Sequence, residues 1–139
     1  MPETPQYLIY ADGSCIGNPG HGGWGFVIVA PDGSRRERNG HAPATTNNRM
    51  EITAVIEALR ATEPGSNIVL RSDSQYVINT MTKGWKRNKN HDLWPLLDAE
   101  AARRKVNFEW VRGHDVDPLN HRADQLAVMG SNQRLVGEN

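Results

Sequence analysis

The sequence has a single cysteine and no long run of apolar residues. Because Cys15 has no second cysteine to pair with, an intramolecular disulfide is excluded, and a reducing cytoplasm is the expected compartment. The first residues lack the basic and apolar stretches of a secretory leader, and no window approaches about eighteen apolar residues. We therefore expect neither secretion nor membrane insertion.

Two further absences concern charge and zinc ligands. The sixteen basic and sixteen acidic residues cancel, which argues against indiscriminate binding to polyanions. The five histidines have no companion cysteines at zinc spacings, so a structural zinc site is not expected. A local basic run nevertheless extends through Lys83, Lys86, Arg87 and Lys89 without an intervening acid. This run is either a nucleic-acid-binding patch or simply a solvated loop.

The order of apolar segments and turns predicts an α/β fold. With 139 residues, of which 37% are hydrophobic, the chain is most simply one domain over residues 1–139, with flexible tails at 1–6 and 131–139. Three short strands come first and helix-separated strands follow, so we expect one mixed sheet of five strands, three antiparallel and then two parallel, flanked by helices. The expected strands cover residues 7–11, 24–29, 35–41, 68–72 and 106–111, and the expected helices cover 48–62, 74–82, 92–104 and a stretch from about 120.

Two carboxylates lie where strands end. Asp12 follows the apolar run 7–11, and Asp73 follows the run 68–72. A carboxylate at such a position is expensive to desolvate unless it is hydrogen-bonded or binds a metal. Neighbouring strands lie about 4.8 Å apart, so acids at matching strand ends can contact the same divalent ion. Either acid taken alone would be read as an ordinary strand end or turn.

Two more acids border the apolar faces of predicted helices. Glu51 lies at the edge of the stripe formed by Ile52, Val55, Ile56 and Leu59. Asp124 borders the later stripe of Leu119, Ala123, Leu126 and Ala127, although a solvated surface acid would explain either position. If all four acids converge, they form an acidic pocket suited to Mg²⁺, a hard ion that prefers carboxylate oxygen.

Four motifs carry a resemblance to a known family. They are Asp12 to Gly20 (DGSCIGNPG), Thr45 to Glu51 (TTNNRME), Ser72 to Tyr76 (SDSQY), and Trp110 to His114 (WVRGH) followed ten residues later by Asp124. Each motif alone is weak evidence, but all of them occur in family order. From about residue 7 to 130 the chain resembles the type 1 ribonucleases H, the bacterial ribonuclease HI family, in a form with a shortened basic handle.

The resemblance implies a fold and a chemistry. It implies the ribonuclease H-like fold, with its five-stranded mixed sheet, and an endonuclease that hydrolyses the RNA strand of RNA/DNA hybrids to 5′-phosphate and 3′-hydroxyl ends. By resemblance the catalytic residues are Asp12, Glu51, Asp73, Asp124 and the loop histidine His114. The four carboxylates would bind two Mg²⁺ ions, for which Mn²⁺ can substitute, and His114 would exchange protons or help the product leave.

Substrate contacts are implied in the same way. Asn18, Asn47 and Gln75 match positions that read the sugars and backbone, and Thr46 and Asn90 match positions that grip a DNA phosphate. Capping of the following helix would also explain Thr46. The glycines of the first motif region would let the backbone approach the duplex, or they serve ordinary turns; they are Gly13, Gly17, Gly20, Gly22 and Gly23.

The chain departs from the family pattern in two places. Ala44 occupies a place where relatives often have a basic residue. The segment between Tyr76 and Trp94 is short, so only Trp85 and the basic run remain of the long handle. Trp85 would stack on the DNA strand or pack in the core. We expect weaker hybrid binding than in handle-bearing relatives, because fewer phosphates are neutralised.

Rival interpretations are a binding module that holds hybrids or double-stranded RNA without cutting, and other nucleases or strand-transfer enzymes of this fold. A module could lose Asp12 or Asp73 freely, so the complete set of carboxylates together with His114 favours catalysis. The expected partner is the RNA/DNA hybrid; we expect a monomer with no obligatory protein partner.

Overall fold

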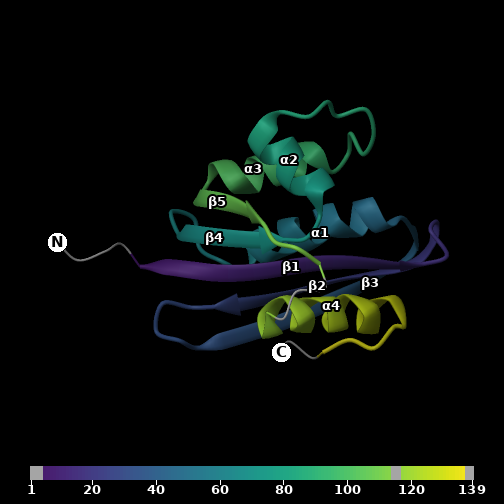
Figure 1. Ribbon diagram of the computed structural model, residues 1–139, viewed down its shortest axis with the longest axis horizontal. Helices are drawn as coiled ribbons and strands as arrows, with labels where there is room; N and C mark the ends of the chain where they lie inside the picture. The colour runs from purple at the N-terminus through teal and green to yellow at the C-terminus, as the bar shows by residue number, and fades with distance from the viewer. Residues whose placement is uncertain (1–4, 114–116, 137–139) are drawn as a thin grey trace.

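The computed structural model describes residues 5–113 and 117–136, and its sheet runs through the middle of the molecule (Figure 1). Within these residues the strands are β1 (Gln6–Ile16), β2 (Gly20–Val29), β3 (Arg35–Thr45), β4 (Asn67–Ser72) and β5 (Lys105–Trp110). The helices are α1 (Asn47–Arg60), α2 (Gln75–Lys83), α3 (Trp94–Ala102) and α4 (Pro118–Ser131).

The sheet is mixed, with strand order β3-β2-β1-β4-β5. The first three strands pair antiparallel, whereas β4 pairs parallel with both β1 and β5. This arrangement confirms the predicted fold class, because the hairpin-linked strands form the antiparallel half and the helix-separated strands form the parallel half. The central strand is β1, which has an antiparallel neighbour on one side and a parallel neighbour on the other.

The two faces of the sheet are covered differently. Helices α1, α2 and α3 lie on one face, and α4 lies on the other (Figure 1). Alternate side chains of β1 point to opposite faces. Thus Ile9 and Ala11 belong to the core under α1, whereas Tyr10 packs with Val27 and Leu126 under α4.

Helix α1 joins the large core through the predicted stripe. Its residues Ile52, Val55, Ile56 and Leu59 are all buried, as the spacing requires. The helix begins after Thr46, whose side chain accepts a hydrogen bond from the Arg49 backbone N–H, a standard N-cap. Among the described residues, no helix combines the length and apolar character needed to cross a bilayer.

Two element boundaries differ from the prediction in ways that matter for the site. Strand β1 continues past Asp12 to Ile16, because β2 keeps pairing with it from Asp12↔Gly25 to Ile16↔His21. Asp12 is therefore an interior residue of the central strand rather than the residue that ends it.

Part of the segment that we expected to be a flexible tail, from residue 131 onward, is held by the fold. Ser131 is the last residue of α4 and is buried. The next residues are fastened by buried Asn39, whose side-chain amide donates to the Arg134 carbonyl at 2.9 Å and accepts from the Val136 N–H at 2.8 Å. Through residue 136, therefore, the chain is held against β3.

Candidate active site

Three of the predicted carboxylates meet at one place. Asp12 of β1, Glu51 of α1 and Asp73, which directly follows β4, each offer an oxygen atom within 4.8 Å of the others. The parallel pairing explains how two of them meet, since Tyr10 lies opposite Arg71, two residues before Asp12 and Asp73 respectively. Glu51 joins them from the first turn of α1, which packs on β1. Folding thus gathers residues that are far apart in the sequence into one acidic group.

Close contact between β1 and α1 depends on Gly13. Its backbone N–H donates to Asp12 Oδ1 at 2.9 Å and to Glu51 Oε1 at 2.8 Å, so one amide orients two carboxylates. A side chain here could not be accommodated, because a Cβ atom on Gly13 would lie 2.4 Å from the Glu51 backbone nitrogen. The glycine therefore allows the helix to bring Glu51 to the strand.

The fourth carboxylate, Asp124, comes from the opposite face of the sheet. It is exposed on α4 and lies within hydrogen-bonding reach of Asp12. Helix α4 reaches this position because β2 has glycines beneath it: a Cβ atom on Gly23 would lie 2.2 Å from the Ala127 carbonyl oxygen, and one on Gly25 would lie 2.6 Å from the Leu126 Cβ. The fifth predicted catalytic residue, His114, lies outside the described residues.

Asp73 is held in place through its backbone carbonyl group. The indole N–H of Trp110, the last residue of β5, donates to the Asp73 carbonyl oxygen at 3.1 Å. Gly113 is also close, since a Cβ atom there would lie 3.0 Å from Asp73 Oδ2. Trp110 and Gly113 are thereby placed against the carboxylate cluster.

Because the carboxylates are buried next to one another, either a bound cation or protonation stabilises the cluster. Burial is the first reason that the pKa of Asp12 is raised far above the usual carboxyl range, and the negative charge of Glu51 is the second. The pKa of Glu51 is also raised, again mainly by burial. Glu51 Oε2 is buried and meets no hydrogen-bond donor among the described residues. An unpartnered buried oxygen beside two further carboxylates suits a hard divalent cation, which would supply the missing partner.

Four of the predicted substrate residues surround one pocket beside the cluster. It has a volume of about 360 Å³ and is lined by Asn18, Thr46, Asn47, Asn48, Lys89 and Asn90. The Asn47 N–H donates to Asn18 Oδ1 at 2.9 Å, which ties the first motif to the start of α1. Asn90 is oriented from two sides, because its amide donates to the Tyr76 hydroxyl and its oxygen accepts from Arg49. Lys89 adds a positive charge to this polar pocket at the N-terminus of a helix, where anions are favoured.

The remaining two predicted substrate residues lie at the two ends of α2. Gln75 is the exposed first residue of that helix, which follows the capping residue Ser74. Trp85 lies just beyond the helix and is 47% exposed, so it belongs to neither core cluster. The structure thus rejects core packing for Trp85 and leaves its indole available at the surface.

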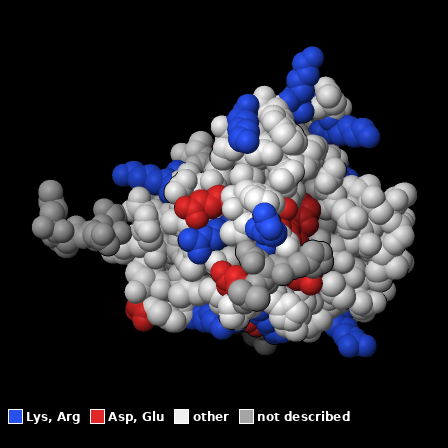
Figure 2. All heavy atoms as spheres, in the orientation of Figure 1, with Lys and Arg blue, Asp and Glu red and all other residues white. Residues whose placement is uncertain are grey.

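The basic run divides into two parts. Arg87 forms an ion pair with Asp98 of α3, and its guanidinium lies 5.2 Å from the centre of the Trp94 ring, so it anchors the loop after α2. Lys83, Lys86 and Lys89 are exposed and make no ion pair with any residue in 5–113 or 117–136. Figure 2 shows basic side chains standing out over α2 and the loop after it, apart from the acidic side chains nearer the middle of this face.

Most of the glycines do not serve the role expected of them. Gly13 and Gly23 face α1 and α4, and Gly22 faces Thr45 and Met50, where a Cβ atom would lie 2.3 Å from a Thr45 methyl group. Their missing side chains make room for the protein's own packing rather than for a duplex. Gly17 does serve a turn, with φ +66° and no atom closer than 3.8 Å to a Cβ placed there.

Comparison with known proteins identifies the family. The model of the RNase H family matches residues 4–132, which is nearly the whole chain. The chain belongs to the RNase H family. A Pseudomonas aeruginosa ribonuclease HI is 47% identical over 143 aligned positions that cover 94% of this chain and 96% of the relative. Membership among the bacterial type 1 ribonucleases H, and hence among nucleases, confirms what the motifs predict.

Solved structures agree with this assignment. LC9-RNase H1, a type 1 RNase H, superimposes with a TM-score of 0.81 at 32% identity and covers 100% of this chain and 80% of its own. LC11-RNase H1 in complex with an RNA/DNA hybrid gives 0.78 at 24% identity over 91% of this chain and 97% of its own, a likeness that concerns the fold alone. Both therefore share the overall fold of this chain.

Proposed function

We propose that this RNase H family chain hydrolyses the RNA strand of RNA/DNA hybrids and leaves 5′-phosphate and 3′-hydroxyl ends. The single observation that carries the proposal is the convergence of Asp12, Glu51 and Asp73 oxygens within 4.8 Å, with Asp124 in reach of Asp12. Family membership supports the reaction class, and one structural neighbour, LC11-RNase H1, was crystallised with such a hybrid.

The cluster would hold two Mg²⁺ ions, with Mn²⁺ able to substitute. Asp12, the least exposed of the acids, would hold the ions together with Glu51, Asp73 and Asp124. When bound, such ions acidify a water nucleophile and neutralise the leaving oxygen of a phosphodiester. The all-oxygen ligand set fits a hard ion and disfavours softer metals.

The residues of the chain would prepare the reaction by fixing positions. The Gly13 amide orients Asp12 and Glu51 before any substrate arrives, so little reorganisation is needed when the phosphodiester binds. His114, which follows Gly113 in the sequence, would exchange a proton with the reacting groups or assist product departure.

Recognition of the hybrid would be divided between two surfaces. The pocket at the start of α1 would take a DNA phosphate, favoured there by the positive end of the helix dipole and by the Lys89 ammonium. Asn18, Asn47 and Gln75 would read the sugar and backbone of the strands, including the 2′-hydroxyl that marks RNA. Trp85, exposed beyond α2, would stack on a base or sugar of the DNA strand.

A cleavage assay tests the proposal. A labelled RNA/DNA hybrid, double-stranded RNA and double-stranded DNA are each incubated with the protein in Mg²⁺ and in EDTA. We expect cutting of the hybrid alone, only with the metal, with ends that a ligase-based assay identifies as 5′-phosphate and 3′-hydroxyl. Binding of the hybrid without cutting in Mg²⁺ or Mn²⁺ would instead support a binding module.

A matched pair of variants links the activity to the cluster. Asp12→Asn is expected to reduce cleavage by more than about 100-fold while the fold persists, because losing a direct ligand exceeds losing an outer partner. Asp32→Asn, at an exposed acid in the β2–β3 turn, should cleave at the wild-type rate. Cleavage by the Asp12 variant near the wild-type rate would refute the assigned role.

A further inference from the structure

A second group of polar side chains crosses the sheet beside the carboxylate cluster. It consists of Tyr10 on β1, Arg71 on β4, Glu109 on β5 and Asp117 at the start of α4, and we name it the Tyr10 network. Tyr10 lies opposite Arg71, and Arg71 lies opposite Glu109, so three neighbouring strands contribute one row of side chains. The motifs that define the site include none of these residues.

The row is joined by a continuous series of hydrogen bonds. The Arg71 guanidinium donates to Glu109 Oε1 at 2.9 Å and to the Tyr10 hydroxyl at 2.8 Å. The Tyr10 hydroxyl in turn donates to Asp117 Oδ2. The guanidinium also lies 5.7 Å from the centre of the Tyr10 ring. Tyr10 is thus held by a cation on one side and a carboxylate on the other.

The network lies one repeat of the strand before the carboxylate cluster. Tyr10 and Arg71 precede Asp12 and Asp73 by two residues each, which is about 7 Å along a strand and returns to the same face. The strands themselves are fixed by the backbone ladder of the sheet. Helix α4 has no such ladder, and its position depends on side-chain contacts. The element that gains most from the network is therefore α4.

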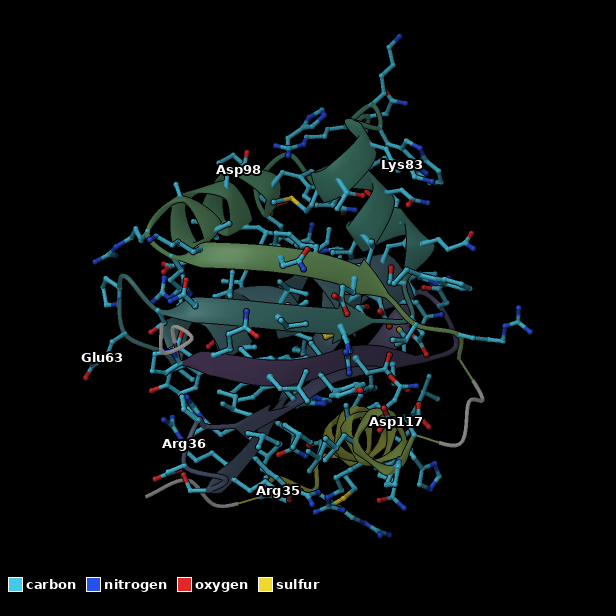
Figure 3. All side chains as sticks on the ribbon, turned by 60° about the vertical axis from the view of Figure 1, so that its left-hand side comes forward. Arg35, Arg36, Glu63, Lys83, Asp98 and Asp117 are labelled. Carbon is cyan, nitrogen blue, oxygen red and sulfur yellow. The ribbon has the colours of Figure 1, made fainter. Side chains whose placement is uncertain are left out.

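Asp117 transmits the constraint to α4. It is the N-cap of the helix: its Oδ1 accepts from the Leu119 N–H at 2.9 Å, while Oδ2 is occupied by Tyr10. Figure 3 shows Asp117 beside the end of α4. Asp124 follows seven residues later (124 − 117 = 7), about 10 Å along the same rigid helix. Fixing the cap therefore fixes how far Asp124 reaches toward Asp12.

From this geometry we propose that Tyr10 is a positioning residue for Asp124. Its hydroxyl ties the first turn of α4 to the central strand and so sets the fourth carboxylate against the other three. The proposal deepens the proposed function, on which it rests. Packing alone does not require the hydroxyl, since the ring of Tyr10 is already surrounded by Val27, Ala123 and Leu126, and a phenylalanine ring would fill the same space.

The test compares two tyrosine-to-phenylalanine variants on the same strand. Tyr10→Phe removes the hydroxyl that bonds Asp117. Tyr7→Phe is the matched control, because Tyr7 packs on the opposite face under α1 and its hydroxyl has no hydrogen bond to the described residues. Mn²⁺ binding is measured by calorimetry on the uncomplexed protein, and the Mg²⁺ concentration for half-maximal hybrid cleavage is measured separately.

We expect Tyr10→Phe to weaken Mn²⁺ binding and to raise the half-maximal Mg²⁺ concentration by about 10-fold, the lower end for outer partners of metal ligands. Tyr7→Phe should leave both values unchanged. Asp117→Asn, which keeps an oxygen for the helix cap, should weaken Mn²⁺ binding in the same direction as Tyr10→Phe. Unchanged metal binding in a folded Tyr10→Phe protein would overturn the proposal.

A double-mutant cycle separates positioning from general stabilisation. If Tyr10 acts through Asp124, Tyr10→Phe should change Mn²⁺ affinity by less than about twofold once Asp124 is already Asn. An equal loss in both backgrounds would mean that the hydroxyl acts elsewhere. The outcome is also independent of the proposed function: a wild-type protein that cuts no hybrid refutes the nuclease assignment, whereas cutting with an unchanged Tyr10→Phe refutes only the positioning role.

Discussion

At the scale of single residues, Asp12 is the most demanding group in this molecule. It is 4% exposed, sits in the interior of the central strand, and has three other carboxylates around it. Its Oδ1 accepts a hydrogen bond from the Gly13 backbone amide at 2.9 Å. Such a residue opposes folding when it is charged and unpartnered, so its presence is explained by the ligand it serves rather than by stability.

The burial of these carboxylates makes the stability of the metal-free protein depend on pH. The pKa values of Asp12 and Glu51 are raised in the folded state, so at neutral pH the folded protein holds more protons than the unfolded chain does. Their contribution to stability is complete below about pH 4, where both states are protonated, and is lost as pH rises toward the raised values. We expect the melting temperature in EDTA to fall over this range relative to Asp12→Asn.

Thermal unfolding from pH 4 to pH 9 measures that difference. The variant removes one of the two titrating groups, so its melting temperature should exceed that of the wild type by a margin that grows with pH. Mg²⁺ should raise the wild-type value and reduce the margin. Parallel curves for the two proteins would show that the pKa of Asp12 is not raised in the folded state.

Trp85 offers a prediction about the substrate alone. Because its ring is 47% exposed, Trp85→Ala should leave stability within about 0.5 kcal/mol of the wild type. If the ring stacks on the DNA strand, the same change should weaken hybrid binding by about 1 to 3 kcal/mol. Fluorescence anisotropy in the inactive Asp12→Asn background measures this. Leu96→Ala, an exposed apolar residue on α3, is the control, and an equal effect there would argue against stacking.

At the scale of elements, α4 decides whether the site is complete. Among the described helices it alone covers the second face of the sheet, and it brings Asp124 to the cluster. Its approach to β2 relies on glycines, and a bidentate ion pair from Arg122 to Glu37 of β3 holds its outer side, with both N–O distances 3.0 Å. A small outward movement of this helix would separate the fourth carboxylate from the rest.

Gly23→Ala tests that dependence. The added Cβ atom would lie 2.2 Å from both the Ala127 carbonyl oxygen and the Ser131 nitrogen, which are backbone atoms that cannot turn away. We expect a loss of about 3 kcal/mol in the free energy of unfolding, measured by urea denaturation, and weaker metal binding. Gly33→Ala, in open space but with φ +88°, should cost only about 1 kcal/mol. A loss at Gly23 no greater than at Gly33 would contradict the packing argument.

The sequence predicts these elements well because their signals are local. The spacing of Ile52, Val55, Ile56 and Leu59 identifies the buried face of α1, and strand-helix alternation identifies the parallel half of the sheet. Asp124 borders the apolar stripe of α4, is exposed, and lies within hydrogen-bonding reach of Asp12.

What the sequence does not reveal depends on distant contacts. Tyr10 reads as one more member of an apolar run, and its partner Asp117 lies 107 positions away in a polar loop. No periodicity links them, because their meeting depends on how α4 docks on the sheet. The role of the β2 glycines is not predicted for the same reason, because a glycine that faces a helix and one that faces a duplex have the same local sequence pattern.

At the scale of the whole molecule, a neutral total conceals a separation of charge. Lys83, Lys86 and Lys89 project around α2 and its loop, while the carboxylates gather at the sheet. Figure 3 shows Lys83 at the opposite end of the molecule from Arg35 and Arg36. The lysines around α2 would therefore attract a polyanion locally, while Arg35 and Arg36 carry positive charge at the far end as well.

Salt dependence of hybrid binding tests this arrangement. Replacing Lys83, Lys86 and Lys89 by Ala in the Asp12→Asn background should reduce the slope of log K against log salt by about 0.9 for each lysine that contacts a phosphate. Arg35→Ala should leave the slope unchanged. In the active protein, the same lysine changes should raise KM and spare kcat. An unaltered slope would place the duplex elsewhere.

The central strand of the sheet is the first of the described elements to be synthesised, and the helix that covers its second face is the last of them. A nascent chain that ends before Pro118 can pair its strands, yet Tyr10 and Val27 face water and Asp124 has not been made. The fourth carboxylate therefore joins the site only once α4 has been synthesised. The order of the described elements thus couples assembly of the full acidic set to the docking of one late helix on the first strand.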